Sequence, residues 1–235
     1  MTSASLYERF YFSRPEYISG TVRFHNLIRE SCRIESDILE IGCGPSNETS
    51  RFLATIGPLT GIDIERIENE ALFCFEKFDG YTFPFAAQSF DMCVSNYVLE
   101  HVADAEMHFQ EVARVLRPGG FYFFRTPNLW HYVTLGARLL PHSLHLKLAN
   151  RLRGISGHDP YPTHYLANSR NALNRLCSQA RLNPLRLEMV EAEPSYGRAH
   201  PLLFYPMMGY ERVVNRFHWA ERFRANILGI IASRK

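Results

Sequence analysis

Residues 37–46 read Asp37-Ile38-Leu39-Glu40-Ile41-Gly42-Cys43-Gly44-Pro45-Ser46. The apolar run at its start predicts a buried strand, the two glycines predict a tight turn, and the next residues, 47–54, predict a helix. A glycine turn between a strand and a helix lets backbone N–H groups approach a ligand and places an anion at the helix N-terminus. The sequence therefore predicts a ligand-binding βα unit.

Further strand candidates follow this unit and alternate with longer helical patterns. One of these helices has Asp104 as its expected N-cap and carries Phe109, Val112 and Leu116 on one apolar stripe. Such alternation is typical of repeated βαβ units that build a parallel sheet, so we expect an α/β fold. With residues 37–41, the strand candidates number seven; the other six are residues 59–62, 71–75, 90–95, 121–124, 185–190 and 225–233.

Two segments interrupt the alternation. Residues 129–167 are rich in His, Pro and Tyr, with a helical pattern near 135–152, and residues 194–222 are dense in aromatic and Met side chains. We expect both to be insertions that form a lid over an acceptor site, and residues 1–34 to form an N-terminal helical cover. Without an internal repeat or a separable linker, one domain over residues 1–235 is the simplest organisation.

Composition and charge limit the class of protein. The chain has 235 residues, of which 46% are hydrophobic and 21% charged, as in an ordinary globular protein. Its five Cys include no CxxC pair, so we expect neither a disulfide framework nor a metal site, and with no signal peptide or membrane span we expect a cytoplasmic protein. Net charge is −7 over residues 1–125 and +9 over 126–235. The basic half is either a solvated surface or attracts anionic acceptors, lipid headgroups or nucleic acid.

The turn favours a cationic ligand over a dinucleotide. In the dinucleotide motif GxGxxG a third small residue follows, but Asn47 stands there, and Glu40 would repel a pyrophosphate. S-adenosylmethionine instead offers a carboxylate to the turn, an ammonium and a sulfonium to nearby acids, and a ribose and an adenine. Asp63, 19 positions after Gly44, is placed to accept the ribose hydroxyls, and Asp79 to meet the adenine amine.

Taken together, these motifs resemble the class I S-adenosylmethionine-dependent methyltransferases, especially the subgroup that includes the ubiquinone and menaquinone C-methyltransferases. The matching runs are residues 39–44, 61–63, 83–91, 97–102 and 111–120. The resemblance implies a doubly wound, Rossmann-like sheet of seven strands in the order 3-2-1-4-5-7-6 with one strand antiparallel. It also implies a transferase whose cofactor is S-adenosyl-L-methionine and whose product is S-adenosyl-L-homocysteine.

The resemblance also assigns roles to individual residues. The cofactor-binding residues would be Glu40, Gly42 and Gly44 at the methionine part, Asp63 at the ribose, Asp79 and Gly80 at the adenine, and Ser95, Asn96 and Tyr97 beside the sulfonium. Other readings stay open, since strand-end acids can be solvent-exposed or cap helices, and a turn Asp is common. For Asp91 and Glu111 we expect structural positions, with Glu111 on a helix surface.

A general base is needed only if the acceptor must lose a proton, and methyl transfer otherwise depends on positioning and exclusion of water. Three histidines, His101, His131 and His164, follow strands or lie in the first insertion, on the side where such sheets bind ligands. We expect His131 to be the base and His101 to be the second catalytic candidate.

The expected function is methyl transfer to a hydroxyl of a small molecule, glycan or glycolipid. Alternatives are C-methylation of a quinone-like ring, or a non-catalytic S-adenosylmethionine-binding partner subunit. The aromatic second insertion could close an acceptor pocket, dock on a membrane beside Arg212 and Arg216, or form a dimer contact. Nucleic acid is an unlikely partner because residues 95–98 lack the (N/D)PP(Y/F) run and no nucleic-acid module is present. The oligomeric state stays open.

Overall fold

The computed structural model describes residues 2–32, 35–67, 72–139, 161–194 and 200–234, and its chain divides into two compact units. The first, which we call the sheet unit, comprises Phe24–Pro127, Thr163–Glu188 and Ile227–Lys235. The second, the helical unit, comprises Met1–Arg23, Asn128–Pro162 and Met189–Asn226. Each unit is described by itself.

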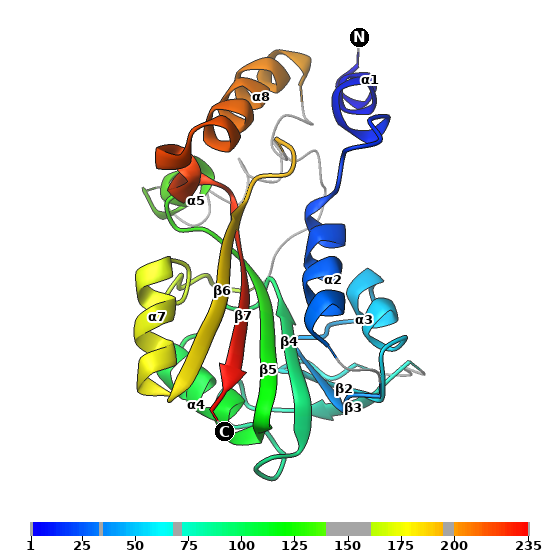
Figure 1. The fold of residues 1–235 in the computed structure, drawn as a ribbon, viewed down its shortest axis with the longest axis vertical. Coiled ribbons are helices and arrows are strands. Elements are labelled where there is room, and N and C mark those ends of the chain that lie inside the picture. The colour runs from blue at the N-terminus through cyan, green and yellow to red at the C-terminus, as the bar shows by residue number, and fades with distance from the viewer. Residues whose placement is uncertain (1, 33–34, 68–71, 140–160, 195–199, 235) are drawn as a thin grey trace. The chain divides into compact units, whose positions relative to one another are not determined.

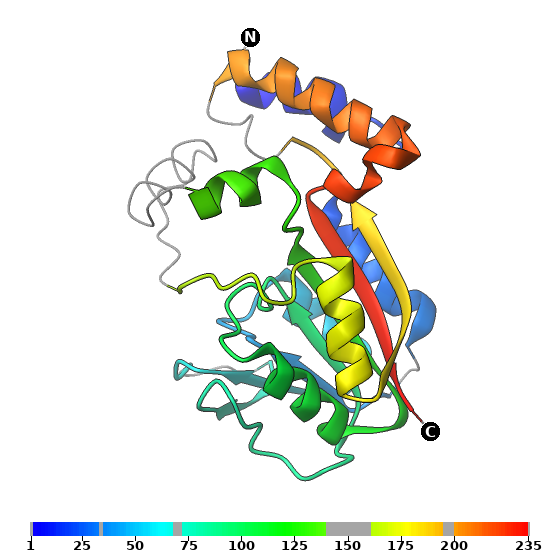
Figure 2. The same ribbon diagram turned by 90° about the vertical axis from the view of Figure 1, so that its left-hand side faces the viewer.

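A seven-stranded sheet runs in the order β3-β2-β1-β4-β5-β7-β6, as predicted (Figure 1). β7 runs opposite to β5 and β6 (Figure 2), so the sheet is mixed and the predicted α/β, Rossmann-like class is confirmed. The strands are β1 (Ile38–Ile41), β2 (Leu59–Asp63), β3 (Cys74–Lys77), β4 (Phe90–Asn96), β5 (Leu116–Pro127), β6 (Leu182–Val190) and β7 (Asn226–Ser233).

β1 lies in the middle of the sheet, and all four of its residues are buried. It pairs in parallel with β2, where Ile41 lies opposite Ile62, and with β4, where Ile41 lies opposite Ser95. In a parallel sheet the carboxyl ends of neighbouring strands share one edge. The segments that follow β1, β2 and β4 therefore begin close together.

Helices cover both faces of the sheet. α2 and α3 lie on one face, and α4 and α7 lie together on the other (Figures 1 and 2). The predicted N-cap Asp104 accepts the Met107 N–H at 2.9 Å, and α4 buries Phe109 and Val112 as its apolar stripe predicted. The helices of the sheet unit are α2 (Gly20–Ser31), which enters this unit at Phe24, α3 (Glu48–Leu53), α4 (Ala105–Val115) and α7 (Arg170–Gln179).

Three predicted strand boundaries were wrong. The sixth strand, β6, begins at Leu182 rather than at residue 185. The third strand is Cys74–Lys77 rather than residues 71–75, and it is an exposed, charged edge strand without the apolar pattern that sequence reading follows. The fifth begins at Leu116, before the predicted start at residue 121, because β5 bulges: Leu116 pairs with Phe90 but Phe121 already pairs with Met92.

The predicted surface position of Glu111 was also wrong. Its side chain is buried, accepts the Phe83 N–H at 2.7 Å and forms an ion pair of 2.6 Å with Arg114. The Arg114 guanidinium and the Phe83 amide hold the pKa of Glu111 below its usual range. Glu111 therefore anchors the loop before β4, which keeps it a structural residue, as expected.

The helical unit holds α1 (Ser3–Tyr7), η1 (Glu8–Phe12), α5 (Tyr132–Leu139), α8 (Pro201–Arg216) and η3 (His218–Phe223). Its apolar core joins Leu6, Tyr7 and Tyr11 to Phe204 of α8. The Tyr11 hydroxyl donates to Glu211 at 3.0 Å, so η1 is held to α8 by a polar as well as an apolar contact. Of the predicted helix near 135–152, residues 140–152 lie outside the described ranges.

Among the described residues, no helix has the length and apolar character needed to cross a membrane.

Candidate functional site

The turn after β1 needs two glycines for different reasons. Gly42 and Gly44 adopt φ of +64° and +53°, the left-handed region that favours glycine. A Cβ on Gly42 would lie 2.5 Å from Cγ2 of Val98, whereas a Cβ on Gly44 would meet no atom of the described chain within 4 Å. The turn thus packs tightly at Gly42 and faces open space at Gly44.

Asp63 joins the end of β2 to this turn. Its Oδ2 accepts the Gly44 N–H at 3.0 Å, and its Oδ1 accepts the Glu65 N–H at 3.1 Å. The carboxylate therefore fixes both its own loop and the backbone at Gly44. The structure thus brings these two sequence-predicted residues together.

Glu40 is a buried acid beside the turn. Its side chain is 3% exposed and takes a hydrogen bond from Ser50, and Oε2 has no partner among the described residues. Burial raises the pKa of Glu40 to about 7, because an isolated carboxylate is poorly solvated there. A cation at Oε2 would satisfy this oxygen, so the site fits the positively charged end of S-adenosylmethionine.

Asn47 explains why the third glycine of a dinucleotide motif is replaced. Its Oδ1 accepts the N–H groups of Thr49 and Ser50 at 2.8 and 3.3 Å, and its Nδ2 donates to the Cys43 carbonyl at 3.2 Å. Asn47 is thus the N-cap of α3 and also closes the glycine turn. The side chain stabilises the turn without needing a close approach to a pyrophosphate.

Asn96, at the end of β4, is held from both sides. Its Nδ2 donates to Thr49 Oγ1 at 3.0 Å, and its Oδ1 accepts the Arg125 Nε–H at 2.7 Å. His25 of α2 extends the network, with Nε2 3.3 Å from Thr49 Oγ1. The amide of Asn96 is therefore fixed by α3 and β5 before any ligand binds.

Tyr97 continues from Asn96 with a strained backbone. Its φ is +59°, unusual for a residue with a side chain, and its N–H donates to the Arg125 carbonyl at 2.8 Å. The Arg125 guanidinium lies 4.5 Å from the centre of the Tyr97 ring, which is 41% exposed. Sequence reasoning missed Arg125, Thr49 and His25; the available signal was a charged residue directly after the apolar run 121–124.

Asp79 and Gly80, the predicted adenine contacts, lie in an ordinary turn. Asp79 Oδ1 accepts the Tyr81 and Thr82 N–H groups at 2.8 and 2.7 Å, and these bonds hold the pKa of Asp79 below its usual range. Gly80 has φ of +88°. This arrangement explains why Asp and Gly occur here without any ligand, so the adenine contact stays a prediction.

Two of the three candidate bases lie in the sheet unit. The His101 N–H donates to the Val98 carbonyl at 2.9 Å, directly after the β4 segment that carries Tyr97. The His164 N–H donates to the Glu100 carbonyl at 2.7 Å. Both histidines therefore lie near the loop that follows β4.

His131, the preferred base, lies in the helical unit and is 4% exposed. Its Nε2 is 3.7 Å from Glu191 Oε2, too far for a hydrogen bond, and has no partner among the described residues. Burial lowers the pKa of His131 to about 4 and raises that of Glu191 to about 8. Near pH 7 both groups are uncharged, so this is a contact between neutral side chains.

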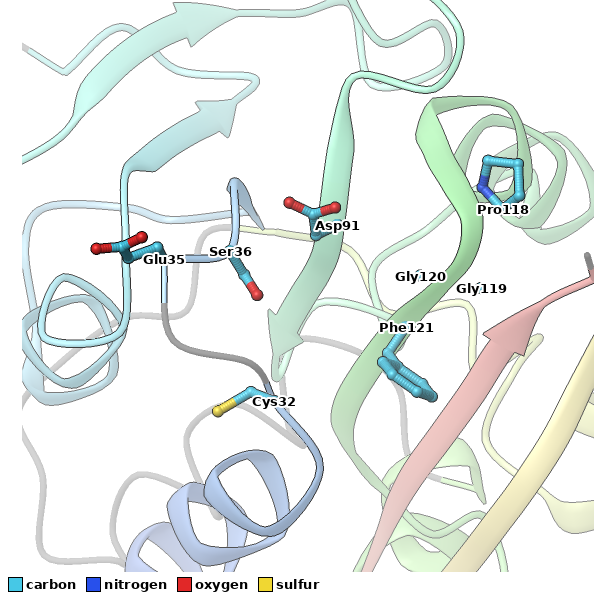
Figure 3. A pocket seen from close by; sticks show the side chains of 8 residues that line it. All are labelled: Cys32, Glu35, Ser36, Asp91, Pro118, Gly119, Gly120 and Phe121. Carbon is cyan, nitrogen blue, oxygen red and sulfur yellow. The ribbon is translucent and has the colours of Figure 1, made fainter.

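A cavity of about 170 Å³ lies at the opposite edge of the sheet, where β1 and β4 begin (Figure 3). Beside it, Arg117 bridges Asp37 and Asp91 at 2.8 and 2.7 Å. These ion pairs explain why charged residues lie beside the cavity without any ligand, and parallel sheets bind ligands at the other edge, so we do not assign this cavity a function. Among the described residues, no group of His, Cys, Asp and Glu is arranged to hold a metal ion. The cavity is lined by Cys32, Glu35, Ser36, Asp91, Pro118, Gly119, Gly120 and Phe121.

Comparison with known proteins identifies the region that carries the site. Residues 39–124 match a family model described as a methyltransferase domain. The malonyl-[acyl-carrier protein] O-methyltransferase of Erwinia billingiae is 30% identical over 95 residues, 38% of each protein. An uncharacterized methyltransferase of Mycolicibacterium vanbaalenii is 30% identical over 181 residues, 70% of this chain and 62% of that protein.

The fold of this chain resembles that of a solved structure over a longer range than residues 39–124. A chain in the Haloferax volcanii complex of a methyltransferase with the Trm112 methyltransferase activator has a TM-score of 0.58 at 15% identity, covering 90% of this chain and 87% of that one. At such identity the likeness concerns the fold. The chain spans less than two thirds of the length of the two curated relatives above. The matched residues 39–124 nevertheless include the glycine turn, Asp63 and Asn96.

Proposed function

We propose that this chain, which carries a class I S-adenosylmethionine-dependent methyltransferase domain, transfers a methyl group to a hydroxyl oxygen. The predicted family, fold and cofactor, S-adenosyl-L-methionine, are confirmed by the family match and the sheet order. The acceptor class, a hydroxyl of a small molecule, glycan or glycolipid, is the proposal. Similarity to an enzyme named as an O-methyltransferase favours oxygen over ring carbon.

The observation that carries the cofactor-binding part of the proposal is the unpartnered, buried oxygen of Glu40, two residues before a glycine turn that faces open space at Gly44. A buried polar atom without a partner costs free energy unless a ligand satisfies it. When bound, S-adenosyl-L-methionine supplies an electrophilic methyl group on a sulfonium. Glu40 would face its positive end, and the carboxylate of the cofactor would lie in the open space at Gly44, whose own N–H already donates to Asp63.

The remaining site residues would orient the cofactor and exclude water. Asp63 would accept hydrogen bonds from the ribose, and Asp79 and Gly80 would border the adenine. Asn96 is fixed by Thr49 and needs no reorganisation, so it can position the reacting end at low entropic cost. Tyr97, partly exposed, would cover the sulfonium.

A hydroxyl acceptor must lose its proton during transfer, and this requirement is the reason for proposing a base. His131 remains the first candidate, because its imidazole is neutral near pH 7 and its Nε2 has no hydrogen-bond partner among the described residues; the burial that lowers its pKa to about 4 also makes it a weaker base than a solvated histidine. His101 is the second candidate, because it directly follows the β4 segment. An acceptor that is already ionised would need neither.

Purified chain incubated with methyl-labelled S-adenosyl-L-methionine and a panel of hydroxyl acceptors should release S-adenosyl-L-homocysteine and label oxygen in at least one of them. Matched compounds whose hydroxyl is replaced by hydrogen should stay unlabelled. Labelling of a quinone ring carbon would contradict the acceptor proposal but keep the methyltransferase. Cofactor binding without turnover on any acceptor would favour a binding-only partner subunit.

Cofactor affinity should rise with pH up to about 7 and level off above it. A cation binds the ionised form of Glu40, whose pKa is about 7, so affinity should fall about tenfold per pH unit on the acidic side. The same raised pKa makes the free protein less stable as pH rises from about 4.5 to about 7, since the folded state holds the proton more tightly. Calorimetric titration with S-adenosyl-L-homocysteine and S-adenosyl-L-methionine across this range measures how affinity changes with pH. It also measures the proton that Glu40 should release when the ligand binds below pH 7.

The matched variant is Glu40→Gln, which keeps the size of the side chain but cannot ionise. Its cofactor affinity should be weaker and nearly independent of pH, and its unfolding free energy should lose the decline between about pH 4.5 and 7. A variant that retains the pH slope of the wild type would assign the titration to another group and remove Glu40 from the cation site.

A further inference from the structure

One side of α8 is exposed along its whole length. Apart from Asn215, the exposed residues of α8 recur every three or four positions, so they occupy about a third of the helix circumference. η3 follows directly and adds exposed residues of the same kinds. We call this surface the α8–η3 face; it comprises Leu202, Tyr205, Pro206, Gly209, Arg212, Val213, Arg216, Phe217, Trp219 and Arg222.

The other side of α8 already has its partners within the helical unit. Phe204 and Val214 are fully buried, and α1 packs against the helix (Figure 2). Tyr210 donates to the Phe223 carbonyl at 2.6 Å, and Asn215 donates to the Glu191 carbonyl at 3.0 Å. The apolar residues of the exposed face are therefore not needed to hold the helix in place.

The face exposes several large apolar side chains, and two of them, Phe217 and Trp219, lie against each other. Leu202 is 76% exposed and Trp219 is 68% exposed, and Trp219 stacks on Phe217 with their ring centres 6.0 Å apart. Scattered exposed apolar residues are normal, but a contiguous set marks an interaction surface. Trp and Tyr, with one apolar and one polar end, are enriched at membrane–water interfaces.

The charge of the face is positive. Arg212, Arg216 and Arg222 lie on it, whereas the nearby acids are engaged: Glu211 accepts the Tyr11 hydroxyl, and Glu221 lies 3.3 Å from His218. A symmetric dimer through this face would bring like charges from both copies together. Lipid phosphates would instead complement all three guanidinium groups.

From these observations we propose that the α8–η3 face docks on an anionic lipid surface. Leu202, Phe217 and Trp219 enter the headgroup layer, while the arginines contact lipid phosphates. The inference goes beyond methyl transfer and does not depend on it. It makes the protein a peripheral membrane protein.

Flotation of the full chain with vesicles tests the proposal. The chain should float with phosphatidylcholine–phosphatidylglycerol vesicles, but not with pure phosphatidylcholine vesicles, and less so as salt is raised. Arg212→Glu/Arg216→Glu should weaken binding at least about tenfold, since each basic residue near an anionic surface contributes about a fivefold gain. Leu202→Ser/Trp219→Ser should weaken binding at least about tenfold as well, because it removes apolar side chains that enter the headgroup layer. In a Trp130→Phe background, Trp219 emission should shift to shorter wavelength on binding.

Matched controls lie on the sheet unit. Arg175→Glu on α7 and Leu185→Ser on β6 change exposed residues of the same types and should leave vesicle binding unchanged. Circular dichroism and urea unfolding report that every variant is folded. Absence of flotation, or equal flotation by the face variants and controls, would overturn the proposal. So would a wild-type dimer in sedimentation that Leu202→Ser/Trp219→Ser converts to monomers, because a second copy would then cover the face.

Discussion

Replacing Asp63 with alanine should weaken S-adenosyl-L-homocysteine binding about 100-fold, because two charge-assisted hydrogen bonds contribute about 1.5 kcal/mol each. The carboxylate has two tasks in this expectation. It holds the Gly44 amide at 3.0 Å, and it accepts the ribose hydroxyls that only a ligand provides. Isothermal titration calorimetry of the wild type and the variant measures the loss directly.

Two further variants separate these tasks. Asp63→Asn keeps an oxygen for the Gly44 amide but loses the charge, so its affinity should fall between those of the wild type and Asp63→Ala. Asp79→Ala should cost less than about tenfold, because that carboxylate is already engaged by its own turn and lies at the surface. Wild-type affinity in Asp63→Ala would contradict the proposed ribose contact, provided that circular dichroism shows a folded variant.

Local rules predicted the parts of the fold that depend on neighbours in sequence. Asp104 caps α4 because its side chain reaches an amide three residues on, and the apolar stripe of that helix needs only the 3.6-residue period. The strand–turn–helix at the start is equally local. The order of the strands, in contrast, came from the family resemblance, since a run of apolar residues does not say which strand it pairs with.

The parts that were missed depend on residues far apart in sequence. Arg125 reaches Asn96 across two strands, and Glu111 accepts an amide 28 positions earlier in the chain. The burial of His131 involves Glu191, 60 positions away. A single sequence carries no periodic signal for such pairs. A charged residue directly after an apolar run, as at Arg125, is the clue that could have marked one of them.

Gly42→Ala should destabilise the protein more than Gly44→Ala, although both glycines have positive φ. Each substitution places alanine in the left-handed region at about 1–2 kcal/mol. At position 42 the new Cβ would also lie 2.5 Å from Val98, and relief of that overlap should add about 1–3 kcal/mol. Urea unfolding of both variants measures their unfolding free energies. The additional cost of Gly42→Ala that comes from the overlap should largely disappear when the substitution is made in a Val98→Ala background, that is, when Gly42→Ala/Val98→Ala is compared with Val98→Ala.

Cofactor binding should depend on the two glycines in a different way. Gly44→Ala adds its methyl group to the open space at the turn, so it should weaken S-adenosyl-L-homocysteine binding at least about tenfold while the protein stays nearly as stable as other left-handed Ala variants. Gly42→Ala should weaken binding only through the distortion that its overlap with Val98 causes. In Gly42→Ala/Val98→Ala, where the overlap is removed, the affinity should therefore be close to that of the wild type. A stable Gly44→Ala variant with wild-type affinity would show that the ligand lies elsewhere, because a methyl group and a bound carboxylate cannot share that space.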